Sequence, residues 1–208
     1  MRKIVAIQKV KRNKCKYEIE LDDGQVYYLL DEFVALKNIY CNKKISDEEI
    51  KEISIESEKK EAFLTCVKTL ERTLKSKLQI VNKLKEKGFS DEAIDHSIAS
   101  LVDYNFLNDE NFAKSYANTY QNKKGSKLIM FELKNKGITR ETAIQATKNI
   151  DNNATALKLA EKFMKNRETN KDNLQKLFRH LIYKGFEFDM ARKMVLKFGA
   201  GESDESWN

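Results

Sequence analysis

The chain has 208 residues, with 39 Lys and Arg against 32 Asp and Glu, three Cys and no Pro. Its composition, 41% hydrophobic and 34% charged, is enough for a buried core and argues against global disorder. No apolar run approaches the roughly 20 residues that cross a bilayer, and the basic first residues lack the apolar stretch of a secretory signal. We therefore exclude an integral membrane protein and expect a cytoplasmic one, whose three separated thiols stay reduced.

Charge is distributed unevenly along the chain. Residues 1–16 carry seven basic side chains and no acidic one, whereas residues 17–57 have a net charge of −7. Residues 107–150 carry +4 and residues 151–199 carry +5. A basic field of this kind favours a polyanionic partner, either a nucleic acid or an acidic protein surface. A Lys-rich surface that is only solvated is the alternative.

The first 55 residues have the pattern of a small β-hairpin followed by helices. Alternating apolar residues predict strands over residues 4–10 and 17–30, with Asp22, Asp23 and Gly24 as the turn inside the second segment. Two short helices are expected next, the second opening at Ser46 with the Ser-x-x-Glu pattern of a capping box. We assign residues 1–55 to this N-terminal unit.

The rest of the chain repeats itself. Gly88, Gly137 and Gly185 end similar strings and lie 49 and 48 residues apart, which indicates a repeat architecture. The sequence predicts a mainly α protein with three tandem three-helix repeats in an elongated, curved array, followed by a disordered acidic tail over residues 200–208. The repeats are assigned to residues 56–106, 107–150 and 151–199. The expected helices are 58–74, 76–87, 91–104, 109–122, 126–136, 140–149, 153–166, 171–184 and 188–198.

Each repeated glycine has the surroundings of a helix stop. When a glycine with positive φ ends a helix, the residue after the glycine is normally apolar. It contacts the apolar side chain four positions before the glycine, in the last turn of the helix. The pairs that meet this rule are Phe89 with Leu84, Ile138 with Leu133, and Phe186 with Leu181. Ser90 and Thr139 are then expected to cap the next helix in the first two repeats, whereas the third has Glu187 at that place.

The sequence offers little for catalysis. His96 and His180 have no other metal-ligating residues at suitable spacing, and the chain contains no GxGxxG, GxxxxGK[ST] or HExxH motif. We therefore expect a protein that is not an enzyme and that holds no metal and no cofactor.

Two features of the second repeat suit nucleic-acid contacts. Phe112, Tyr116 and Tyr120 form an aromatic stripe that could stack on bases, although helical spacing favours the core. The loop Lys123–Ser126 opens a helix with positive charge and backbone donors, which suits a phosphate. The alternative for this loop is simple solvation.

Residues 101–116 (LVDYNFLNDENFAKSY) and 132–138 (ELKNKGI) resemble the core signature of the RecX family of bacterial recombinase regulators. The segments 83–89 (KLKEKGF) and 21–24 (LDDG) are also similar to longer family members. The resemblance covers residues 4–198, and the family's three tandem three-helix repeats agree with the period found here. Asn105 stands where the family often has Gly, and Asn tolerates the left-handed backbone of a turn.

The resemblance implies a protein that binds the RecA–single-stranded DNA filament along its helical groove and inhibits strand exchange, ATP hydrolysis and co-protease activity. The expected partners are the RecA filament and single-stranded DNA, bound directly or through RecA, with the regulator a monomer. Seven basic residues of the second and third repeats are the expected contacts: Lys123, Lys124, Lys127, Arg140, Arg179, Lys184 and Arg192. Two rival interpretations stay open, a sequence-tolerant nucleic-acid-binding protein that acts without RecA and a pure protein scaffold.

Overall fold

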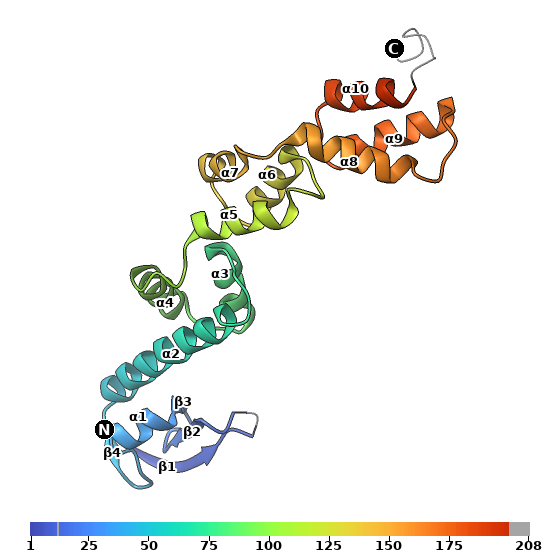
Figure 1. Ribbon diagram of the computed structural model, residues 1–208. Helices are drawn as coiled ribbons and strands as arrows, with labels where there is room; N and C mark the ends of the chain where they lie inside the picture. Colours follow the sequence, from blue (N-terminus) through green and yellow to red (C-terminus); the bar gives the residue numbers. More distant parts are fainter. Residues whose placement is uncertain (12, 200–208) are drawn as a thin grey trace. The chain divides into compact units, whose positions relative to one another are not determined.

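The computed structural model describes residues 1–11 and 13–199 and is mostly helical, with a small sheet near the N-terminus (Figure 1). The described residues up to Leu107 form one compact unit, and those from Asn108 onward form a second. The predicted tail, residues 200–208, lies outside the described residues. Among the helices described, none is long and apolar enough to cross a membrane.

The N-terminal unit contains an antiparallel sheet with strand order β3-β2-β1-β4. The strands are β1 (Arg2–Lys9), β2 (Lys16–Leu21), β3 (Val26–Leu30) and β4 (Lys44–Ile45), and α1 (Asp31–Leu36) follows β3. Gly24 has φ +80° in the tight turn between β2 and β3, as the Asp-Asp-Gly pattern predicts. The predicted strands are confirmed, and the two-residue β4 is too short to give a sequence signal.

One expectation about this region is wrong. The second short helix and the predicted helix 58–74 are a single helix, α2 (Asp47–Leu70), which runs through the expected boundary at residue 55. Ser46 caps its start by accepting a hydrogen bond from the amide of Glu49. Ile50 and Ile53 pack into the core under the sheet, whereas Ala62 and Cys66 of the same helix pack into the next core. A single helix thus serves two cores, which is why it does not end between them.

The first repeat is completed by α3 (Lys77–Glu86) and α4 (Asp91–Asp103). Ser76 and Gln79 form a reciprocal capping box at the start of α3. At the end of α4, Asn105 has φ +56°, so this residue does adopt the left-handed backbone expected of it.

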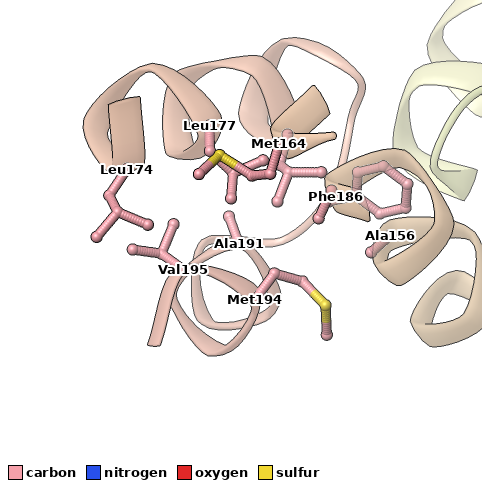
Figure 2. Packing of buried hydrophobic residues seen from close by; sticks show 10 residues of the cluster. Ala156, Met164, Leu174, Leu177, Phe186, Ala191, Met194 and Val195 are labelled. Atoms are coloured by element: carbon pink, nitrogen blue, oxygen red, sulfur yellow. The ribbon is translucent and has the colours of Figure 1, made fainter. Parts of the chain in front are cut away.

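The second unit contains two three-helix groups. Their bounds agree with the sequence prediction to within two residues at each end: α5 (Asp109–Tyr120), α6 (Ser126–Asn135), α7 (Arg140–Thr147), α8 (Asn152–Met164), α9 (Lys171–Tyr183) and α10 (Phe188–Phe198). Ile129 and Leu133 lie in the core of the first group. Figure 2 shows the core of the second, where Met164 of α8, Leu177 of α9 and Ala191 of α10 meet.

The three glycine stops have the predicted geometry. Gly88, Gly137 and Gly185 have φ between +81° and +84°. In each, the following residue's amide donates to the carbonyl five residues earlier, and the glycine's amide donates to the carbonyl three residues earlier, the two bonds of a Schellman motif. Ser90 and Thr139 cap the next helices as expected, whereas the Glu187 side chain makes no cap hydrogen bond.

Candidate interaction surface on the second and third repeats

The loop that opens α6 is packed against the turn between α9 and α10. The amide of Gly125 donates to the carbonyl oxygen of Lys184 at 2.8 Å. A Cβ on Gly125 would lie 2.5 Å from the carbonyl oxygen of Gly185, and one on Gly185 would lie 2.3 Å from Cβ of Leu128. Two glycines therefore let the second and third repeats approach backbone to backbone.

Polar side chains of α8 add to this contact between the loop before α6 and the turn between α9 and α10, which we call the joint. The amide of Ser126 donates to Oδ1 of Asn152, and Nδ2 of Asn152 donates to the Ser126 hydroxyl. The Thr155 hydroxyl donates to the carbonyl of Gln121. The amides of Gly125 and Ser126, proposed from the sequence as phosphate donors, are thus used inside the protein. The loop is neither an open phosphate cradle nor merely solvated.

Lys124 belongs to a network within the second repeat. Its ammonium lies 2.6 and 2.7 Å from the two carboxylate oxygens of Glu132 and 4.2 Å from the ring centre of Tyr120. The Tyr116 hydroxyl donates to Glu132 at 2.9 Å. Burial is the main cause that raises the pKa of Tyr116, and its hydrogen bond to Glu132 adds to the increase. The network engages Lys124 before any partner binds.

The aromatic stripe of Phe112, Tyr116 and Tyr120 belongs to the core of the second repeat. Phe112 is buried, Tyr116 stacks beside it with ring centres 6.0 Å apart, and Tyr120 lies 4.5 Å from Tyr116. Since Lys124 covers the Tyr120 ring, we exclude this stripe as a base-stacking surface.

The other predicted contact residues differ in their surroundings. Lys127 forms an ion pair with Glu187, which ties α6 to the residue that precedes α10. Lys123, Arg140 and Arg179 are exposed, on the loop before α6, at the start of α7 and on α9. Lys184 and Arg192 are partly buried. The structure brings Lys123, Lys124, Lys127 and Lys184 together around the joint, because the Gly125–Lys184 hydrogen bond places their segments side by side.

His180 lies on α9 between hydrophobic and cationic neighbours. Its ring centre is 4.9 Å from that of Phe163. Burial lowers the pKa of His180, and the charges of Lys184 and Arg167 lower it further. The imidazole is therefore mainly neutral at pH 7 and adds little charge to the basic surface. Across residues 1–11 and 13–199, no group of three or more His, Cys, Asp or Glu side chains is arranged to hold a metal ion.

One exposed aromatic residue was missed by the sequence analysis. Tyr183, the last residue of α9, is 78% exposed. The sequence signal was its position outside the buried row Leu174, Leu177 and Leu181 of the same helix. Ile182, the residue before it on the same helix, is also exposed.

The fold defines a helical-repeat protein with several basic side chains around the contact between its second and third repeats. Family models support that class: the second three-helix domain of RecX matches residues 108–146, and the third matches residues 151–195. The chain is 34% identical to the "Regulatory protein RecX" of Clostridium perfringens strain SM101, over 97% of this chain and 99% of that protein. It is 30% identical to the protein of the same name from Clostridium botulinum strain Alaska E43, over 94% of this chain and 95% of that protein. The chain belongs to the RecX family.

Solved structures share the fold. A crystal structure of regulatory protein RecX has a TM-score of 0.66 at 23% identity and covers 93% of this chain and 98% of its own. The structure of RecX from Lactobacillus salivarius has a TM-score of 0.60 at 24% identity and covers 69% of this chain and 97% of its own. Both support the mainly helical repeat architecture that the sequence predicts.

Proposed function

We propose that this protein regulates the RecA recombinase by binding the RecA–single-stranded DNA filament and lowering its strand exchange, ATP hydrolysis and co-protease activity. The observation that carries the proposal is the 34% identity, over nearly the whole of both chains, to a protein named "Regulatory protein RecX". RecA as the partner follows from the family resemblance of the sequence. The net charge of +9 over residues 107–199 supports binding to a filament that carries DNA phosphates.

The proposed contact residues are the cations that an incoming phosphate or carboxylate can reach without breaking an internal pair. They are Lys123, Arg140, Arg179 and Lys184. Arg192, partly buried on α10, is a further proposed contact that already has an interaction within the protein. Lys124 and Lys127 contribute less in this proposal, because each would first have to release Glu132 or Glu187. We further propose that the protein acts as a monomer in the cytoplasm and without catalysis of its own.

Filament binding after charge reversal tests the proposed surface. RecA is assembled on immobilised single-stranded DNA, and binding of the parent is compared with that of a Lys123→Glu, Arg140→Glu, Arg179→Glu variant. The variant is expected to bind at least tenfold more weakly at low salt and to show a smaller dependence on salt. A Lys51→Glu, Lys60→Glu, Lys87→Glu variant changes net charge equally on exposed positions of the first unit and is the control. Equal binding by parent and reversed variant would contradict the surface.

The rival function, nucleic-acid binding that does not involve RecA, predicts a different result. In that case the protein would bind bare DNA with equal affinity whether or not RecA is present, and it would leave RecA activities unchanged. The charge-reversed variant would then lose DNA binding alone. A pure scaffold would show no salt-sensitive affinity for DNA.

A further inference from the structure

Tyr183 is the most exposed aromatic side chain among the described residues, at 78%, ahead of Tyr104 at 68% and Tyr40 at 60%. It lies two positions after the buried Leu181, which turns it about 200° around the helix axis, away from the core. A large ring that is mostly exposed contributes little to folding, since burial is the source of hydrophobic stabilisation. The ring is therefore available to a ligand.

The backbone beneath this ring is held firmly. Tyr183 closes α9 directly before the Gly185 stop, where the amide of Phe186 donates to Leu181 and that of Gly185 donates to Ile182. The next residue, Lys184, accepts the Gly125 hydrogen bond through its carbonyl. Because the main chain is fixed from both sides, binding through the ring restricts few additional degrees of freedom.

Three cations lie near the end of α9 that carries the ring. Arg179 lies one helical turn before Tyr183 on the same face of α9, and Lys184 follows it directly. Lys123 is two residues before Gly125, so the joint brings it to the same end of α9. None of the three forms an ion pair with a carboxylate of the residues that the structure describes, whereas Lys124, Lys127 and Lys176 each do.

An exposed aromatic ring within a group of cations has the chemistry of a single-strand contact. Proteins that bind single strands combine a basic surface for the phosphates with aromatic rings on which unpaired bases stack. A duplex offers the same phosphates but keeps its bases stacked inside, so the ring distinguishes the two forms. An anchor for a protein partner would instead lie in an apolar, desolvated centre, whereas three cations lie at the end of α9 that carries Tyr183.

We propose that Tyr183 stacks on a base of single-stranded nucleic acid while Arg179, Lys184 and Lys123 bind the adjoining phosphates. The protein then contacts the strand itself and not RecA alone. This inference deepens the proposed function, and it rests on that function for the source of the strand, the DNA of a RecA filament.

Binding of the full chain to a fluorescein-labelled dT20 oligonucleotide without RecA tests the contact. Tyr183→Leu keeps an apolar side chain but removes the aromatic face, and it is expected to weaken binding about 5- to 100-fold. Tyr183→Phe keeps the ring and is expected to bind like the parent. Tyr40→Leu removes an exposed ring from the N-terminal unit and is expected to change nothing.

Salt and strandedness separate stacking from charge. Tyr183→Leu is expected to keep the parent's salt dependence, because no cation is lost, whereas Arg179→Gln should reduce the slope of log K against log salt by about 1. A 20-base-pair duplex should bind parent and Tyr183→Leu equally. Parent-like dT20 binding by Tyr183→Leu, or no measurable dT20 binding by the parent at low salt, would overturn the proposal.

RecA ATP hydrolysis, measured with the same proteins, separates base stacking by Tyr183 from the proposed regulation of RecA. If the parent inhibits RecA but Tyr183→Leu binds dT20 normally, stacking is wrong and the proposed function stands. If Tyr183→Leu loses dT20 binding but the parent leaves RecA unaffected, the strand contact stands and the proposed function fails.

Discussion

The amide nitrogen of Gly125 lies 2.8 Å from the carbonyl oxygen of Lys184, a hydrogen bond that joins the start of α6 to the end of α9. The main chains approach so closely that neither Gly125 nor Gly185 has room for a Cβ. This contact fixes the second repeat to the third and places Lys123 and Tyr183 at the same end of α9. It is the structural basis of the proposed surface.

Replacing Gly185 by Ala should destabilise the second unit strongly. The residue has φ +84°, and its new Cβ would lie within 3 Å of the Leu128 backbone. We expect the left-handed backbone alone to cost about 1–2 kcal/mol and the clash to raise the total to about 3 kcal/mol or more. Hydrogen exchange of residues 108–199 measures the loss.

Gly88→Ala is the matched control. Gly88 has nearly the same φ, +81°, but its Cβ would meet no atom within 4 Å. Only the backbone cost of about 1–2 kcal/mol should be seen, and only in the first unit. Equal destabilisation by the two substitutions would show that the close approach at Gly185 has no energetic importance.

Removing the charge of Glu132 should weaken the second repeat and change the titration of Tyr116. Lys124 and Glu132 are 22% and 25% exposed, so their pair is only partly screened by water. Glu132→Gln is expected to reduce stability by about 1–3 kcal/mol, because it leaves Lys124 without its counter-charge. It should also lower the pKa of Tyr116, which an ultraviolet titration of tyrosine ionisation detects. An unchanged high-pH tyrosine transition would argue against the network.

The three thiols should differ in reactivity. Burial raises the pKa of Cys66 to about 11, although Lys83 partly opposes the increase, whereas Cys15 and Cys41 are exposed. Since the thiolate is the reactive form, iodoacetamide at pH 8 should modify Cys15 and Cys41 rapidly and Cys66 only after unfolding. Mass spectrometry of the native protein counts the modified residues. Rapid modification of Cys66 would contradict its packing in the first repeat.

His180 should make the second unit less stable in mild acid. Its lowered pKa means that the unfolded chain binds a proton more readily than the folded chain does. Stability is therefore lost as the pH falls below the ordinary value of about 6.5. The imidazole resonances of His180 should titrate with a midpoint below 6.5, and His180→Gln should reduce the fall in melting temperature between pH 7.5 and 5.5. A midpoint at or above 6.5 would contradict the buried, cationic environment.

The helix stops were predictable because their chemistry is local. Gly137, the buried Leu133 and the apolar Ile138 lie within six residues, and the Schellman rule needs nothing else. The continuity of α2 was harder to predict, since Ser57 stands directly before residue 58 and so resembles the N-cap of a new helix. Ser57 instead lies buried and accepts a hydrogen bond from the amide of Leu30, a contact that only the folded unit provides.

The candidate surface could be predicted only in part. Composition and repeat boundaries placed the positive charge on the second and third repeats. They did not reveal that Lys124 is held by Glu132, eight residues away, or that Gly125 meets a carbonyl from the third repeat. Such pairings depend on how helices pack. The sequence therefore shows where the basic residues are, but it does not show which of them form ion pairs.

The most direct test of the central claim is DNA-dependent ATP hydrolysis by RecA, titrated with this protein. We expect inhibition at well below one molecule per RecA protomer, with the Lys123→Glu, Arg140→Glu, Arg179→Glu variant requiring at least tenfold more protein. Unchanged hydrolysis at saturating protein, together with direct binding to bare DNA, would contradict regulation of RecA and favour a nucleic-acid-binding protein that acts without RecA.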